Sequence, residues 1–239
     1  MKIDIYEIEL ISLAIALIPI AVLIVILALW SLNSKTAVYA SARMLIQLIA
    51  IGYILTSIFT LDNPSIVVLV LVAMLSMASW IALRPLKQRS RDLFFKALIA
   101  ISISGILTLL LITLAVLEID YWYKPQYVIP LAGMIFSNAM NTVSLAAERF
   151  ESDCSSGIDY LHARNNALSV SLIPVINTLF AVGLVALPGM MTGQILSGVS
   201  PLTAAKYQIV IMSVLFGSSG ISAAIYLHLL KHTHTATAS

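Results

Sequence analysis

Polar side chains recur at helical spacing in an apolar run of the sequence, between residues 127 and 147 and just beyond it. They follow one another at i, i+3, i+4 and i+7, and they are Met134, Ser137, Asn138, Asn141, Ser144 and Glu148. This spacing places them on one face of a helix. Amide and thioether groups can contact a cation in transit, while the same amides can bond neighbouring helices together. Both hypotheses predict that this face is buried against protein or water, because unpartnered amides are costly in lipid.

The composition around this run is that of a membrane protein. Of 239 residues, 60% are hydrophobic and only 10% are charged, whereas soluble proteins have about a quarter charged. Seven apolar runs approach the roughly 20 residues that cross a bilayer core. They lie near 10–31, 42–61, 65–83, 94–117, 127–147, 167–187 and 207–230. We therefore expect an all-α polytopic bundle of about seven transmembrane helices, with residues 1–239 forming a single integral membrane domain.

The basic residues predict the orientation of the chain. With the loop 84–92 in the cytoplasm, ten lysines and arginines fall inside, and only Lys2, Lys124 and Lys206 fall outside. Cytoplasmic loops carry such an excess of basic residues, so we expect the N-terminus outside and the C-terminus inside. The same residues are spread over several loops, which argues against nucleic acid as a partner. The only cysteine, Cys154, leaves no internal disulfide.

Two smaller polar groups lie at the ends of other apolar runs. Arg43 and Gln47 are one helical turn apart at the inner end of the second run. Arg43 either extends to the membrane interface or belongs to a gate. Pro174 and Asn177 lie in the sixth run, where a proline frees a backbone carbonyl and permits a bend. We assign these four residues a gating or structural role.

The sequence contains neither a nucleotide-binding loop nor a clear metal site. No G-x-x-x-x-G-K-[ST] motif is present, so any ATP hydrolysis must come from another chain. His228, His232 and His234 near the C-terminus are typical of a polar tail, although histidines at i and i+4 can bind a metal. No charged or thiolate cluster lies at membrane depth. The metal ligands are therefore unknown, and we expect no cofactor.

The chain resembles the FetB-type permeases in four stretches: "ARMLIQLIAIGYIL" (42–55), "VIPLAGMIFSNAMN" (128–141), "IPVIN" (173–177) and "GLVALPGMMTGQILSGVSPLTAAKYQIVIM" (183–212). That family comprises the membrane subunits of iron-exporting ABC transporters, with plant relatives linked to aluminium tolerance. The resemblance extends over nearly the whole chain from about Tyr39. It implies a homodimeric permease of the cell (plasma) membrane with a separate ATP-binding cassette subunit. It also implies alternating access and export of a metal ion such as iron.

The resemblance also suggests a place for the glycine-rich segment 188–206. In such a permease, the break at Pro188 and Gly189 would end one span without leaving the protein. Irregular backbone near membrane depth is tolerated only where protein or a water-filled cavity covers it. We therefore expect the segment at the outer mouth, folded against the bundle; an ordinary extracellular loop is the alternative. The translocation path would then be lined by Met134, Asn138 and Asn141, with Met190, Met191 and Gln194 near its outer end.

The segment 148–166 departs from the family pattern. FetB-type permeases carry a longer cytoplasmic segment there, with an L-G-A-T-P element similar to the coupling loop of ABC importers. This chain has only "ERFESDCSSGIDYLHARNN", in which Glu151 and Gly157 keep an E-x5-G spacing. We expect this short loop to couple to the ATPase through Glu151, Gly157, Asp159 and Leu161. Two alternatives stay open, an ATP-independent transporter or channel and a membrane scaffold that has lost coupling.

The excess of basic residues on one side leads to a prediction about topology. On a background without Cys154, a cysteine in place of Ile3 should react with a membrane-impermeant thiol reagent added outside the cell, because we expect the N-terminus there. Labelling of this cysteine only from the cytoplasmic side would contradict the predicted orientation.

Overall fold

The computed structural model describes residues 9–60, 63–118 and 121–231. Two compact units divide the chain, Met1–Leu61 (unit 1) and Asp62–Ser239 (unit 2), and each is described by itself. Throughout the described ranges the regular structure is helical, with one isolated bridge between Val182 and Ala186. The predicted all-α class is confirmed. Ile3, His232 and His234 lie outside the described residues.

Unit 1 is a helical hairpin made of α1 (Leu10–Ala16), α2 (Ile18–Leu29) and α3 (Ser34–Thr60). The first predicted span is divided at Leu17, because Pro19 lies in the first turn of α2 and cannot continue the hydrogen bonds of α1. Asn33 closes the turn by accepting a hydrogen bond from the Thr36 amide at 3.2 Å. Helix α3 begins earlier than the predicted start at residue 42. Within unit 1 taken by itself, α2 and α3 have no buried residue.

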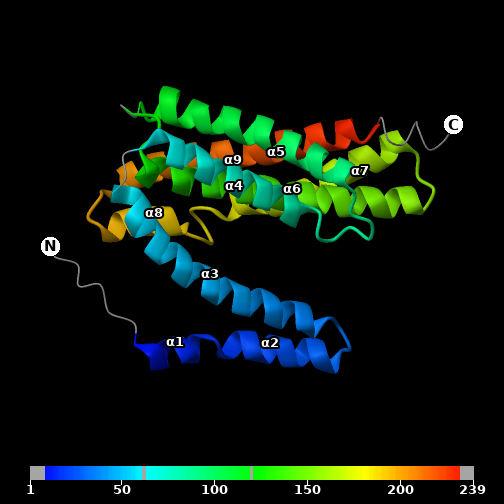
Figure 1. Ribbon diagram of the computed structural model, residues 1–239, viewed down its shortest axis with the longest axis horizontal. Coiled ribbons are helices and arrows are strands. Elements are labelled where there is room, and N and C mark those ends of the chain that lie inside the picture. Colours follow the sequence, from blue (N-terminus) through cyan, green and yellow to red (C-terminus); the bar gives the residue numbers. More distant parts are fainter. Residues whose placement is uncertain (1–8, 61–62, 119–120, 232–239) are drawn as a thin grey trace. The chain divides into compact units, whose positions relative to one another are not determined.

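Unit 2 is a bundle of long helices that run side by side (Figure 1). Its elements are α4 (Pro64–Ala82), α5 (Arg91–Leu110) with the π-helical turn η1 (Leu111–Val116), α6 (Pro125–Ser155), α7 (Tyr160–Ala181), α8 (Gly189–Leu196) and α9 (Pro201–Leu229). Helix α6 is central, since it packs against α4, α5, α7 and α9. The turn between α6 and α7 lies at one end of this bundle, and α8 lies at the other (Figure 1).

The buried stripe of α6 explains its central position. Its residues recur every three or four positions and are mostly small or β-branched: Val128, Ala132, Ile135, Ala139, Val143 and Ala146. Small side chains let neighbouring helix backbones approach closely in a membrane bundle. On α5 the approach requires Gly105, where an added Cβ would lie 2.7 Å from the ring of Phe136. That ring is almost fully buried.

Within the described part of unit 2, three side-chain hydrogen bonds join one helix to another. Ser104 of α5 donates to the Ser218 carbonyl of α9 at 2.8 Å. The Tyr160 hydroxyl of α7 donates to the Leu227 carbonyl of α9 at 3.0 Å. Asp153 of α6 accepts from Asn166 of α7 at 3.3 Å. Such bonds between membrane helices are each worth roughly 0.6–2 kcal/mol, so they fix the register of helices that apolar packing holds together.

Six helical segments are long and apolar enough to cross a membrane, judged on length and composition within the described residues. They correspond to the predicted spans other than the sixth. The sixth forms α7, a continuous helix of 22 residues, whose mean hydropathy is lowered by His162, Arg164 and Asn166 near its start. Helix α8, with 8 residues, is too short to cross a ~30 Å hydrocarbon core. The orientation of the termini stays a prediction.

Gly105 offers a direct test of this packing. Gly105→Ala should lower the free energy of unfolding by about 1–3 kcal/mol, because the new methyl group overpacks the contact with Phe136. Gly217→Ala is the matched control, since a Cβ there meets no atom within 4 Å and alanine favours a helix over glycine by up to about 1 kcal/mol. Thermal unfolding in detergent measures both variants. Equal unfolding temperatures would contradict the tight contact.

Candidate functional site

The polar face of α6 is divided between cavity lining and open surface. Met134 and Asn138 are half-buried, whereas Ser137, Asn141 and Glu148 are exposed. The helices of unit 2 pack around the opposite, alanine-rich stripe of α6, which leaves part of the polar face open in the single chain. That this face meets protein or water stays a prediction. Asn138 donates to the Met134 carbonyl of its own helix at 2.9 Å. This bond satisfies the amide locally and does not join two helices.

A cavity of about 570 Å³ lies between α6, α7, α8 and α9, and we call it the amide cavity. Met134 and Asn138 line it from α6, and Gln208 and Met212 line it from α9. The end of α7 adds the polar side chains of Asn177 and Thr178, and the chain at the start of α8 adds Pro188, Gly189 and Met190. No Asp, Glu, Lys, Arg or His belongs to the lining. The cavity is therefore largely apolar, with a few amide groups and no formal charge.

A second cavity, of about 670 Å³, adjoins the first, and we call it the tyrosine cavity. Met134, Met190 and Ile211 line both cavities and so lie at their boundary. The tyrosine cavity is also lined by Glu118, Lys124, Tyr127, Gln194 and Tyr207. These residues come from the segment before α6 and from the starts of α6, α8 and α9. The two adjoining cavities hollow out unit 2 at the end of the bundle that carries α8, and we call them together the hollow.

The broken backbone between α7 and α9 places α8 beside this hollow. After Ala181 the chain turns at Gly183, whose φ of 82° suits glycine, and the Gly183 amide donates to the Ala186 carbonyl at 2.9 Å. Helix α8 then packs against α9. One turn apart on α8, Met190 and Gln194 both reach the cavity lining.

Helix α8 ends in a glycine cap that prepares the start of α9. Gly198 has a φ of 92°, and its amide and that of Val199 donate to the Ile195 and Gln194 carbonyls at 3.0 Å. This is the Schellman arrangement, which terminates a helix without leaving its last carbonyls unpaired. Ser200 then caps α9 by accepting from the Thr203 amide at 3.3 Å. In the segment 188–206, Gly198 thus terminates α8 and Ser200 caps the start of α9. Placement of this segment at the outer membrane face stays a prediction.

Two glutamine side chains present unpaired oxygens at the hollow. The Oε1 atoms of Gln194 and Gln208 are buried and have no hydrogen-bond partner. Gln208 is only 7% exposed, and a buried carbonyl left unpaired costs about 1–3 kcal/mol, so its oxygen favours an occupant of the cavity that can pair with it. Each oxygen belongs to a residue that lines one of the two cavities. The hollow therefore offers acceptor oxygens to a bound group.

The structure brings together most of the predicted path and gate residues. Met134, Asn138, Met190 and Gln194 line the hollow, and so do Asn177, Pro188 and Gly189. Asn141 and Met191 line neither cavity. Sequence reasoning missed Gln208, which lies two residues after Lys206 and was placed at the edge of a span. Its spacing with Ile211, Met212 and Leu215 is the signal that could have found it, since those residues share one helical face.

Two predicted gate residues, Arg43 and Gln47, belong to unit 1. Arg43 and Gln47 face each other one turn apart on α3. With its amide oxygen turned toward the guanidinium, Gln47 accepts from Arg43 Nε at 3.1 Å and from Nη2 at 3.3 Å. Pro174 lies inside α7, and the Thr178 hydroxyl donates to its carbonyl at 2.9 Å. A gating role for these residues stays a prediction.

The predicted loop 148–166 is mostly helical. Helix α6 continues to Ser155 and α7 begins at Tyr160, so only a short turn separates them. Gly157, with a φ of 82°, occupies the glycine position of a second Schellman cap, in which the Gly157 and Ile158 amides donate to the Cys154 and Asp153 carbonyls. Glu151 accepts a hydrogen bond from the Lys87 amide at 3.2 Å. This bond joins the loop between α4 and α5 to α6. The E-x5-G spacing therefore has a structural explanation, since Glu151 holds a loop against α6 and Gly157 terminates the helix.

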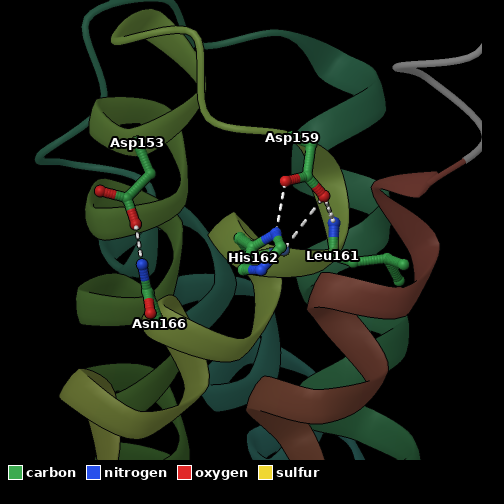
Figure 2. A network of polar contacts seen from close by, with 5 residues as sticks. All are labelled: Asp153, Asp159, Leu161, His162 and Asn166. Atoms are coloured by element: carbon green, nitrogen blue, oxygen red, sulfur yellow. Dashed lines mark hydrogen bonds and ion pairs between the residues drawn. The ribbon is translucent and has the colours of Figure 1, made fainter.

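Asp159 caps the first turn of α7 (Figure 2). Its carboxylate accepts from the Leu161 amide at 3.0 Å and also bonds the His162 ring. The His162 hydrogen bond holds the pKa of the Asp159 carboxyl below its usual value. Leu161, beside this cap, has a side chain that is 55% exposed. The turn therefore presents a fixed leucine at the end of the bundle, together with charged neighbours.

The two asparagines of α6 allow a prediction that separates transport from stability. Asn138→Ala and Asn141→Ala should each change the unfolding temperature little, because Asn138 bonds only its own helix and Asn141 is exposed. Asn138→Ala should nevertheless reduce transport per folded molecule, since Asn138 lines the amide cavity. Asn141 does not line it, so Asn141→Ala is the matched control. Reduced stability with unchanged transport at Asn138 would remove this residue from the path.

Comparisons with known proteins agree with this architecture. The family described as "Uncharacterised protein family (UPF0014)" matches residues 10–164 and 160–234. A UPF0014 membrane protein of Synechocystis is 38% identical over 199 residues, which cover 77% of each chain. The "Probable iron export permease protein FetB" of Escherichia coli is 31% identical, covering 92% of this chain and 89% of FetB. "Protein ALUMINUM SENSITIVE 3" of Arabidopsis thaliana is 30% identical, covering 77% and 72%.

No solved structure matches the chain significantly. The family match divides at 160–164, in the segment whose letters depart from the pattern of the FetB-type permeases. On either side of that point the match extends over nearly all of the described helices. The chain therefore belongs to the UPF0014 family of membrane proteins.

Proposed function

We propose that this chain is the membrane permease subunit of an ABC transporter. It assembles as a homodimer with a separate ATP-binding cassette subunit and exports a metal ion such as iron across the cell (plasma) membrane. The observation that carries the proposal is the pair of adjoining cavities in unit 2, which lie where α7 ends and α8 folds back onto α9. Discontinuous helices that line a polar cavity are a recurrent feature of substrate sites in transporters. The printed name of FetB supplies the class of cargo.

Helix α6 provides the mechanical link that such a permease needs. It is unbroken from Pro125 to Ser155, so it joins the cavity lining at Asn138 to the polar network at Asp153. The two residues are separated by roughly 22 Å along the axis, at about 1.5 Å of rise per residue. A force applied to the turn between α6 and α7 moves both helices, which also line the amide cavity. ATP-driven closure of the partner can thereby change the access to the hollow.

The contact with the ATPase belongs to the turn between α6 and α7. Leu161 is an exposed apolar side chain in a polar setting, which suits an anchor for a partner pocket. Asp159 fixes the first turn of α7 through its cap, so the leucine is held on a rigid element (Figure 2). Glu151 and Gly157 act indirectly, because one joins the inner loop to α6 and the other terminates that helix.

A second candidate function is ATP-independent transport. It is favoured by the shortness of the turn between α6 and α7 and by the division of the family match at 160–164. A secondary transporter or channel would use the same hollow without a partner at Leu161. A non-transporting scaffold, the third possibility, would need neither the hollow nor the partner. The presence of two adjoining cavities argues against the scaffold.

Site-specific crosslinking tests the coupling contact. A photo-crosslinking amino acid in place of Leu161 should capture an ATP-binding cassette protein in cells. The control is the same substitution at Leu184, which is 89% exposed at the opposite end of unit 2 and should capture no ATPase. Capture only from the inner loop, for example from Arg89, would move the contact site. Metal export by the purified chain in vesicles without ATP would replace the ABC proposal with the ATP-independent one.

A further inference from the structure

We propose that the amide cavity is a binding site for a soft monovalent metal cation, of the Cu(I) and Ag(I) class, held by the thioethers of Met134, Met190 and Met212. This inference rests on the proposed function, because it names the class of ion that the permease takes. It differs from the expectation of iron that comes from a relative's name.

Three methionines from three separate helices line this one cavity. Met134 belongs to α6, Met190 to α8 and Met212 to α9, and all three line the amide cavity. Met134 and Met190 also lie at the boundary with the tyrosine cavity. Thioether sulfur is a soft ligand that selects Cu(I) over harder cations. The broken segment between α7 and α9 is what brings Met190 to the other two, because α8 folds back onto α9.

The charge of the lining limits the charge of the ion. Neither a carboxylate nor any other ionisable side chain lines the amide cavity. Among the residues that the structure describes, no three His, Cys, Asp or Glu side chains group in a way that could hold a metal. The desolvation cost of an ion rises with the square of its charge, so an uncharged lining disfavours divalent and trivalent cations most. The adjoining tyrosine cavity adds one carboxylate and one ammonium group, Glu118 and Lys124, whose charges oppose each other. A monovalent ion that prefers neutral sulfur ligands therefore suits this lining best among cations.

The partial charges of the helix ends at the amide cavity do not give its lining a net charge. Helix α7 ends at Ala181, and α8 begins at Gly189, and both residues line the cavity. A helix C-terminus carries a partial negative charge and a helix N-terminus a partial positive one, so the two contributions oppose each other. The remaining directional group is the buried Gln208 Oε1, which lacks a hydrogen-bond partner. This carbonyl oxygen points to a cation or a hydrogen-bond donor as the occupant, and it adds an oxygen ligand to the three sulfurs.

Silver titration of the full-length chain tests the site. The background variant is Cys154→Ser, because a thiol also binds silver. Methionines carrying ¹³C in their methyl groups are observed by NMR in detergent micelles as silver nitrate is added without chloride. The methyl signals of Met134, Met190 and Met212 should shift together at one silver ion per chain. The signal of Met191, which lines neither cavity, should stay in place.

Leucine variants assign the binding energy to these residues. Met134→Leu, Met190→Leu and Met212→Leu conserve side-chain volume and are tolerated in packed interiors. Each should weaken silver binding by at least about tenfold, the lower bound expected even for loss of a group that only supports a ligand. Met191→Leu, next to Met190 in the chain, should leave the affinity unchanged. Silver shifts confined to other methionines, or affinity that survives all three variants, would overturn the site.

The same preparation separates this inference from the proposed function. If no silver binds and the chain with its ATPase still exports another metal ion, the site is refuted and the permease function stands. If silver binds at the three methionines and no ATP-dependent export is found, the site stands and the permease function is refuted. Because the NMR shifts are measured on the Cys154→Ser chain, with its methionines intact, the test does not depend on the folding of the leucine variants.

Discussion

A helix that ends inside a membrane protein must pass its last carbonyl groups to new partners, because lipid offers none. Two glycines of this chain satisfy that constraint in the same way. Gly157 after α6 and Gly198 after α8 both adopt a positive φ and close a Schellman cap. The first cap turns the chain between α6 and α7, and the second turns it from α8 into α9. The second reversal, together with the turn at Gly183, places α8 beside the hollow of unit 2.

The cavities are lined by a continuous face of α6 that is easily recognised once the neighbouring helices are known. Along this face, Tyr127 and Pro130 line the tyrosine cavity and Asn138 lines the amide cavity. Met134, between them, lines both. Beyond Asn138 the same face is exposed. Polar residues on this helix thus have two different environments, and only those near its first half face the hollow. The opposite stripe of small residues is what allows four other helices to pack around α6.

Sequence alone predicted the helices well because apolar runs and their breaks are local signals. The path residues on α6 and α8 were found from amides and thioethers at helical spacing, and four of the six line the hollow. Asn141 could not be separated from Asn138 in this way, because one helical turn decides which of them faces another helix. Gln208 was missed since it lies close to a lysine, and only the fold shows that α9 begins at Pro201. The E-x5-G spacing resembled a coupling signal, but the contacts show a helix cap and a loop attachment.

The polar start of α7 has a consequence for how the protein is made. Arg164 and Asn166 lie in its first turns. Among the long helices of unit 2, α7 is the one that is less apolar than the six candidate spans. Insertion of a helix by the translocon depends on its summed transfer free energy, in which each central charge counts against it by about 2.5–3.5 kcal/mol. Such a segment is poorly recognised when it emerges alone from the ribosome. Helix α6 precedes it by only a short turn and offers Asp153 to Asn166. We therefore expect the two helices to enter the bilayer as a preformed pair that the turn between them holds together.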